Sequence, residues 1–98
     1  MKINKKAIGF LWDRGNLDKN WVKHKVKNTE CEEVFSDKKK VQFKDVLHSD
    51  KENRFILLGK TKKDRLLFIA FTLRDNEVRV ISARDINKRE RKLYEKKT

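Results

Sequence analysis

Several residue types are scarce in this 98-residue chain, and each scarcity excludes a class of protein. The single cysteine, Cys31, cannot form an internal disulfide, which excludes a disulfide-stabilised secreted scaffold and predicts a cytoplasmic protein. The apolar run 66–71 is far shorter than the roughly 20 residues of a membrane-spanning helix, so we expect no membrane partner. Proline is absent and no Gly/Ser-rich linker interrupts the chain, so residues 1–98 are expected to form one domain.

The chain is strongly basic. The 27 Lys and Arg side chains outnumber 15 Asp and Glu, giving a net charge of +12. Every arginine except Arg14 lies in the second half, where guanidinium groups can bind phosphate through two parallel hydrogen bonds. This charge predicts a polyanionic partner, RNA or DNA, although solubility alone is an alternative that composition leaves open.

The hydrophobic pattern predicts an α+β domain with a small antiparallel sheet flanked by helices. Thr29 and Glu32 have the spacing of a capping box at the start of the second helix, and Gly59 is expected to take a positive φ in a turn. Trp12, Trp21 and Cys31 are expected in the core. The expected order is strand 7–12, helix 17–25, a second short helix from about 29, strands 54–59, 66–73 and 78–83, and helix 87–96.

Three arginines are the main candidates for phosphate chemistry. Arg65, Arg79 and Arg84 fall on or beside neighbouring predicted strands, so their guanidiniums are expected to converge on one phosphate. The alternative for Arg79, which interrupts an apolar strand, is an ion pair with Glu77 or Asp75.

Proton transfer needs a different kind of side chain, and the chain offers few. His24 on the first helix and His48 in a loop are the two histidines, and each is either a proton carrier or an inert surface residue. Glu52 is either a base or the ion-pair partner of Arg54. Tyr94 either stacks on a base or anchors its helix to the sheet.

A series of short motifs runs over nearly the whole chain. They are Phe10-Leu11-Trp12-Asp13, Asn20-Trp21-Val22-Lys23-His24, His48-Ser49 with Glu52-Asn53-Arg54-Phe55, Phe71-Thr72-Leu73-Arg74 leading to Val78–Arg84, and finally Glu90 and Tyr94. In this order and at these spacings the chain resembles the BrnT family, toxins of bacterial type II toxin–antitoxin systems. The resemblance implies a RelE-like fold and a ribonuclease that inhibits translation. It also implies a ribbon-helix-helix antitoxin whose complex with the toxin binds operator DNA.

The resemblance and the residue chemistry together give one predicted site. The predicted catalytic residues are His24, Glu52, Arg65, Arg79 and Arg84, and the predicted RNA-binding residues are Lys23, Arg54, Arg74 and Tyr94. No zinc spacing and no carboxylate cluster for Mg²⁺ is evident, so cleavage is expected to need no metal or other cofactor. A non-catalytic RNA- or DNA-binding module and a purely structural partner-binding domain remain as alternatives, because arginines that bind phosphate and arginines that cleave it look the same in sequence.

Overall fold

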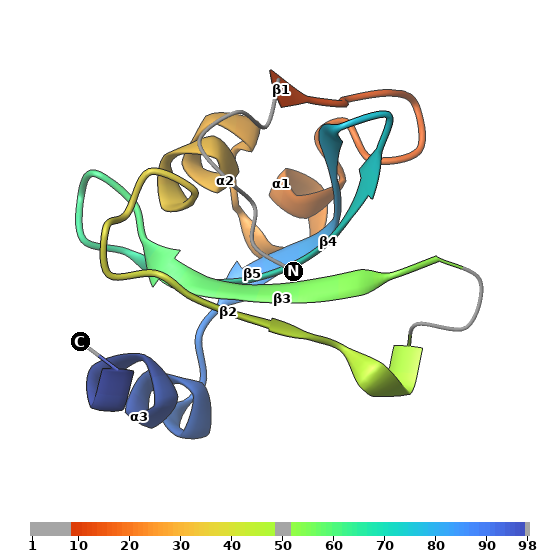
Figure 1. Cartoon of the computed structure of the whole chain (residues 1–98). Coiled ribbons are helices and arrows are strands. Elements are labelled where there is room, and N and C mark those ends of the chain that lie inside the picture. The colour runs from red at the N-terminus through yellow and green to blue at the C-terminus, as the bar shows by residue number, and fades with distance from the viewer. Residues whose placement is uncertain (1–8, 49–51, 98) are drawn as a thin grey trace.

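The computed structural model describes residues 9–48 and 52–97 as an α+β fold built on one five-stranded sheet (Figure 1). The elements are β1 (Gly9–Phe10), α1 (Lys19–His24), α2 (Asn28–Val34), β2 (Val41–Lys44), a 3-10 helix η1 (Val46–His48), β3 (Arg54–Lys60), β4 (Leu66–Arg74), β5 (Glu77–Asp85) and α3 (Lys88–Lys97). The strand order is β1-β5-β4-β3-β2, with β1 parallel to β5 and the other pairs antiparallel. The α+β class is confirmed, but the sheet is mixed, so the expected purely antiparallel sheet is wrong. No helix in the described part is long and apolar enough to span a membrane.

The expected element order missed strand β2. Its four residues pair with β3, from Val41 opposite Leu58 to Lys44 opposite Phe55. This strand forms the sheet edge and has no fully buried residue. Four residues, of which only Val41 and Phe43 are apolar, carry too weak a hydrophobic signal, and only pairing with the buried strand β3 makes this segment a strand.

The three long strands match their predicted ranges to within two residues at each end, because their apolar runs are buried. The hairpin turn is made by Asp75 and Asn76, both at positive φ. A register shift beside Ala70 inserts one extra residue into β5, so Ala83 lies in the same core cluster as Val80. Strict alternation along residues 78–83 would place Ala83 on the opposite face from Val80, and the bulge reverses this.

The two N-terminal helices begin differently from their predicted starts. Asp18 precedes α1 in a left-handed conformation and makes no capping hydrogen bond through its side chain. At α2 the backbone N–H of Lys27 donates to Glu30 Oε1 at 2.9 Å, so the reciprocal contact uses Glu30 and not Glu32. Trp21 on α1 is 44% exposed, so its expected place in the core is wrong.

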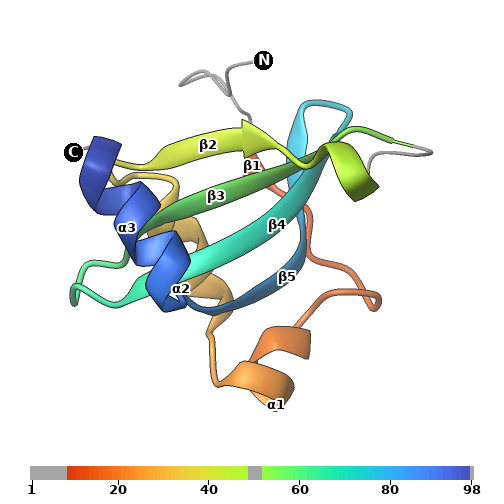
Figure 2. The ribbon, with the colours of Figure 1, turned by 90° about the horizontal axis from the view of Figure 1, so that it is seen from below.

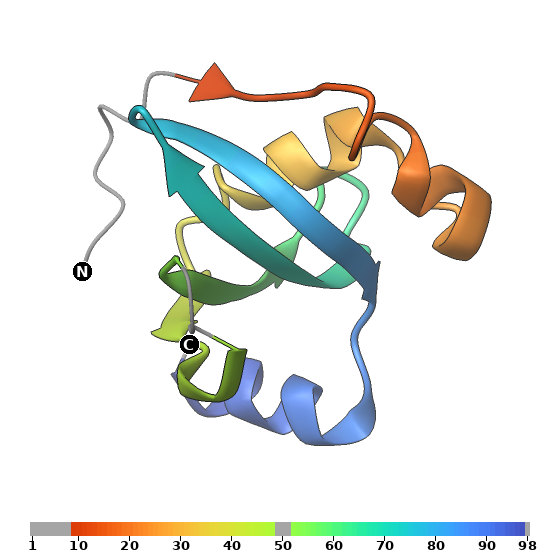
Figure 3. The same ribbon diagram turned by 90° about the vertical axis from the view of Figure 1, so that its right-hand side faces the viewer.

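Helices cover the two faces of the sheet unequally. The helix α2 packs against β3 and β4 on one face, and α1 contacts β5. The helix α3 packs on the other face against β2 and β3, where Tyr94 joins a cluster with Ile56, Leu58 and Ala70. Figure 3 shows α3 and η1 on the same side of the sheet, and Figure 2 shows them over opposite ends of it. We call this side of the sheet the α3 face.

Gly59 has a packing role in place of the expected turn role. A Cβ atom on Gly59 would lie 2.8 Å from Val34 Cγ1, so the missing side chain lets α2 approach β3 closely. The positive φ of the following loop falls on Asp64, at 65°. The expected positive φ at Gly59 is therefore wrong.

Candidate functional site

The predicted site residues fall into two separate groups at the two ends of the long strands. Strands β4 and β5 pair from Leu67 opposite Asp85 to Arg74 opposite Glu77. At roughly 3.3 Å per residue, these two pairs are about 25 Å apart. We call the end at Asp85 the Arg65 end and the end at the β4–β5 turn the hairpin end.

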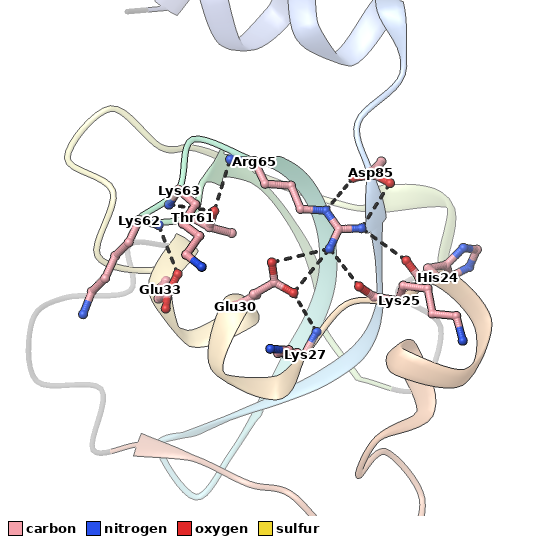
Figure 4. Close-up of polar contacts among 10 residues, drawn as sticks. All are labelled: His24, Lys25, Lys27, Glu30, Glu33, Thr61, Lys62, Lys63, Arg65 and Asp85. Atoms are coloured by element: carbon pink, nitrogen blue, oxygen red, sulfur yellow. Dashed lines mark hydrogen bonds and ion pairs between the residues drawn. The ribbon is translucent and has the colours of Figure 1, made fainter.

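At the Arg65 end, every N–H group of the Arg65 guanidinium has an acceptor (Figure 4). Nε and Nη2 donate to the two carboxylate oxygens of Asp85 at 2.7 and 3.1 Å. Nη1 donates to the carbonyl of Lys25 at 2.8 Å and contacts Glu30 Oε1 at 3.3 Å, while Nη2 also donates to the carbonyl of His24 at 3.2 Å. The hydrogen bonds from Arg65 lower the pKa of Asp85. Arg65 thus joins the end of β5 to the α1–α2 connection, and its charge is neutralised there.

Arg84 is engaged in a comparable way on the α3 face. Its two terminal nitrogens donate to both carboxylate oxygens of Glu90 at 2.9 and 2.8 Å, and its guanidinium carbon lies 4.0 Å from the centroid of the Phe68 ring. Glu90 also accepts the backbone N–H of Asn87 at the start of α3. The hydrogen bonds to Glu90 raise the pKa of the Arg84 guanidinium. Arg84 therefore fastens α3 to the sheet.

The three candidate arginines do not converge. Arg65 binds Asp85 and the α1–α2 connection, whereas Arg84 binds the start of α3 on the other side of the sheet. Arg79 lies five residues before Arg84 along β5, toward the hairpin end. The expected convergence of all three guanidiniums on one phosphate is therefore wrong.

Arg79 has a different environment from the other two. Its side chain is 16% exposed, Nη2 contacts Asp13 Oδ1 at 3.1 Å, and the buried Nε has no hydrogen-bond partner among the described residues. A Cβ atom on Gly15 would lie 2.5 Å from Arg79 Nη2, so the guanidinium rests directly on that loop. The backbone N–H of Gly15, and then Arg79, lowers the pKa of Asp13. The ion pair predicted with Glu77 or Asp75 is replaced by one with Asp13.

Arg54 and Arg79 flank one buried residue in a row across the sheet. Arg54 pairs with Thr72 on β4, and Thr72 pairs with Arg79 on β5. Cross-strand partners share a face, and this row lies on the α3 face because it is two residues along the strands from Ile56 and Ala70. Two strand spacings place the Arg54 and Arg79 backbones about 10 Å apart. The hairpin end therefore carries two half-buried arginines on one face.

A second pair at the hairpin end is more exposed. Arg74 at the end of β4 donates to both oxygens of Glu52, at 3.3 and 3.5 Å, and the two side chains are 48% and 44% exposed. Four of the predicted residues therefore gather at this end, namely Glu52, Arg54, Arg74 and Arg79.

The remaining predicted residues lie elsewhere. Lys23 and His24 are exposed on α1, and His24 meets Arg65 only through its main-chain carbonyl. His24 and Glu52, the two predicted bases, thus lie at opposite ends of the sheet. Tyr94 is 4% exposed and donates its hydroxyl to Asp37 Oδ2 at 2.8 Å. Burial and the Asp37 carboxylate raise the pKa of Tyr94 to about 12, so the tyrosine anchors α3 and offers no open ring face to a base.

Sequence reasoning missed Asp45, which links two groups at the hairpin end. His48 Nδ1 lies 2.9 Å from Asp45 Oδ2, and Arg54 Nε lies 3.9 Å from the same oxygen. The spacing of three residues between Asp45 and His48 is the signal that could have found this pair. No sequence signal identified Gly15 as the residue beneath Arg79.

The other chemistry-bearing groups give no further site. Cys31 is fully buried, and this burial raises the pKa of its thiol to about 12, which makes it a core residue as predicted. Across residues 9–48 and 52–97, no group of three or more His, Cys, Asp or Glu side chains is arranged to hold a metal ion.

Comparison with known protein families agrees with the class of protein that the motifs indicate. A family model described as the ribonuclease toxin BrnT of type II toxin–antitoxin systems matches residues 12–90, which include both ends of the sheet. The chain therefore belongs to the BrnT family, and the resemblance seen in the sequence is confirmed. Membership of a type II system also implies an antitoxin partner. A search of curated proteins gave no match.

Proposed function

We propose that this chain is a metal-independent endoribonuclease whose active site lies at the hairpin end of the α3 face. The observation that carries the proposal is the state of Arg79. Its side chain is 16% exposed and rests on the Gly15 loop, its Nε has no hydrogen-bond partner among the described residues, and it is paired with one carboxylate, Asp13, whose side chain is 44% exposed. An incoming phosphate can displace the exposed Asp13 carboxylate. Arg65 also pairs with an exposed carboxylate, Asp85, but it donates in addition to two main-chain carbonyls of the α1–α2 connection, which cannot leave without disturbing the fold.

The chemistry proposed is transfer of the phosphate to the neighbouring 2′-oxygen of RNA. The 2′-oxygen forms a bond to phosphorus, the bond to the 5′-oxygen breaks, and a 2′,3′-cyclic phosphate results. Negative charge grows on the phosphate oxygens during this step, and fixed guanidinium groups stabilise it. Arg79 and Arg54 supply that charge from opposite sides of Thr72, and Arg74 with Glu52 lies beside them for the flanking backbone.

The test compares Arg79→Lys with Arg14→Lys. Lysine keeps the charge and the apolar stem but loses the planar fork, so we expect about a hundredfold slower cleavage for Arg79→Lys at an unchanged melting temperature. Arg14 is an exposed arginine in the same loop as Asp13, so Arg14→Lys should cleave like the parent chain. Cleavage of a labelled RNA in EDTA and growth arrest of a host without the antitoxin are the two measurements.

Each contrary outcome has a defined meaning. Equal cleavage by Arg79→Lys and the parent removes Arg79 from the active site. Cleavage that disappears in EDTA and returns with Mg²⁺ overturns the metal independence. RNA binding by the parent chain without cleavage or growth arrest would identify the chain as a non-catalytic basic module.

The finer features of the partner and of the setting belong to the same proposal. We expect a cytoplasmic single-domain toxin with the RelE-like fold, which inhibits translation by cutting RNA. Its net charge of +12 favours fast, salt-sensitive association with an acidic partner. The partner proposed is a ribbon-helix-helix antitoxin from the adjacent gene, and the complex should bind its own operator DNA. Co-purification at low and high salt, followed by a gel shift on the upstream DNA, tests both statements.

A further inference from the structure

His48 is held by the side chain of a neighbouring carboxylate, Asp45. Its Nδ1 lies 2.9 and 3.1 Å from the two carboxylate oxygens of Asp45, and its side chain is 62% exposed. Because Asp45 holds Nδ1, the other ring nitrogen, Nε2, is the one available to exchange a proton with a bound molecule. A carboxylate behind a histidine fixes the ring orientation and stabilises the imidazolium when it forms.

Asp45 itself is held in the same row as the two arginines of the hairpin end. Its backbone N–H donates to the carbonyl of Arg54 at 2.7 Å, which extends the β2–β3 pairing by one position. Asp45 Oδ2 also lies 3.9 Å from Arg54 Nε, and the Asp45 side chain is only 16% exposed. The row therefore runs from Asp45 through Arg54 and Thr72 to Arg79, about 14 Å over three strand spacings. His48 stands at one end of this row and Arg79 at the other, on one face of the sheet.

The geometry points to His48 as the general base of RNA cleavage and to Asp45 as its positioning residue, an inference that rests on the proposed function. As the 2′-oxygen attacks phosphorus, its proton passes to His48 Nε2. The bond from phosphorus to the 5′-oxygen breaks, and the 5′-oxygen takes a proton from water. Asp45 stabilises the imidazolium through Nδ1–H, and Arg54 and Arg79 stabilise the charge on the phosphate.

The two bases predicted from sequence fit this role less well. His24 lies at the Arg65 end, about 25 Å along the sheet from the hairpin turn, so it cannot reach a phosphate bound by Arg79. Glu52 lies at the right end, but both of its oxygens accept hydrogen bonds from Arg74, so they are already engaged and not directed at a bound RNA. Among the described residues, His48 faces Asp45, and Arg54 lies beyond Asp45.

The experiment measures single-turnover cleavage of a short RNA between pH 5 and 9 by the parent, His48→Gln and His24→Gln. We expect His48→Gln to cleave at least a hundredfold more slowly and to lose the acidic limb of the parent's pH profile. His24→Gln is the matched control and should stay within twofold of the parent. Binding of the same RNA with 2′-deoxyribose at the cleavage position should be unchanged in all three chains, because it needs no proton transfer.

Two further variants separate catalysis from structure. His48→Ala should regain part of its cleavage rate when imidazole is added. A variant that is slow only because its fold is damaged would not be rescued by imidazole. Asp45→Asn should slow cleavage about tenfold, since it loosens the orientation of the His48 ring without removing the base. Cleavage by His48→Gln at the parental rate and with the parental pH profile overturns the inference while the proposed function stands. A parent chain that binds RNA but never cleaves it overturns both.

Discussion

Arg65 and Arg79 are both partly buried arginines at the same sheet, yet their surroundings differ completely. Arg65, 27% exposed, gives all of its N–H groups to two carboxylates and two carbonyls. Arg79, 16% exposed, contacts one exposed carboxylate and keeps a buried Nε without a partner among the described residues. This difference is the basis for proposing that Arg65 holds the fold and that Arg79 binds phosphate.

The comparison extends from the two arginines to the two ends of the sheet. At the Arg65 end, Glu30 on α2 and Asp85 on β5 both pair with Arg65. Glu90 pairs with Arg84 and joins α3 to β5. At the hairpin end, Arg54, Arg74 and Arg79 each contact a different carboxylate. His48 pairs with the carboxylate that lies beside Arg54. The proposed site thus lies at the opposite end of the strands from the ion pairs of Arg65, and the following variants test whether stability and cleavage are divided in this way.

The largest effect should come from removing the Arg65 guanidinium. Arg65→Ala leaves Asp85, Glu30 and two carbonyls without their donor, so we expect the free energy of unfolding to fall by about 2–3 kcal/mol. Arg65→Lys should recover little of it, because one ammonium cannot reach acceptors on both sides. Urea denaturation measures the loss. The hairpin-end control is Arg74→Ala, where an exposed pair should cost no more than about 0.5 kcal/mol. Equal losses of unfolding free energy for Arg65→Ala and Arg74→Ala would show that the two ends of the sheet do not differ in their contribution to stability.

Tyr94→Phe tests the anchoring of α3. The variant removes the hydrogen bond to Asp37, which keeps its bonds from the backbone N–H groups of Lys39 and Lys60. We expect the free energy of unfolding to fall by about 1 kcal/mol, with RNA cleavage per folded molecule unchanged. Thermal unfolding and a cleavage assay on the same samples check this. Slower cleavage without a loss of stability would indicate that Tyr94 contributes to RNA binding, as the sequence predicted.

The acid sensitivity of the fold should reside at the Arg65 end. Hydrogen bonds from Arg65 hold the pKa of Asp85 below its ordinary value, so the unfolded chain takes up this proton first as the pH falls. The stabilisation from Asp85 is therefore complete near neutral pH and is lost as the pH falls below about 4. Asp85→Asn should be less stable at pH 7 and should show a shallower loss between pH 5 and 3. Parallel curves for variant and parent would show that other carboxylates carry the effect.

The smallest effect on stability should come from Gly15→Ala, which is aimed at the hairpin end. The added Cβ would lie 2.5 Å from Arg79 Nη2, at the far end of a flexible side chain that can move aside. We expect a change in unfolding free energy within about 0.5 kcal/mol, but cleavage slower by about fivefold because Arg79 is displaced. The change should leave the pH profile of cleavage unaltered, since it does not touch His48. Full activity would show that the position of Arg79 is not critical.

The sequence was most informative where one property dominates a segment. Long buried strands have apolar runs that are evident in the sequence. For this reason β3, β4 and β5 were predicted to within two residues at each end. The motifs fixed the family, which the match over residues 12–90 confirms. The short edge strand β2 and the parallel pairing of β1 were missed, because neither has a buried pattern of its own and both depend on the strand beside them.

The arrangement of the charges was decided by the tertiary structure alone. Every arginine carries the same charge and the same donors in sequence, and what distinguishes Arg65 from Arg79 is the set of acceptors that the fold brings to each. Asp85 lies 20 residues from Arg65, and Asp13 lies 66 residues from Arg79, so no local spacing reports either contact. The sequence therefore determined the class, the basic charge and the main strands. Burial and long-range pairing then decided which acceptors each arginine contacts.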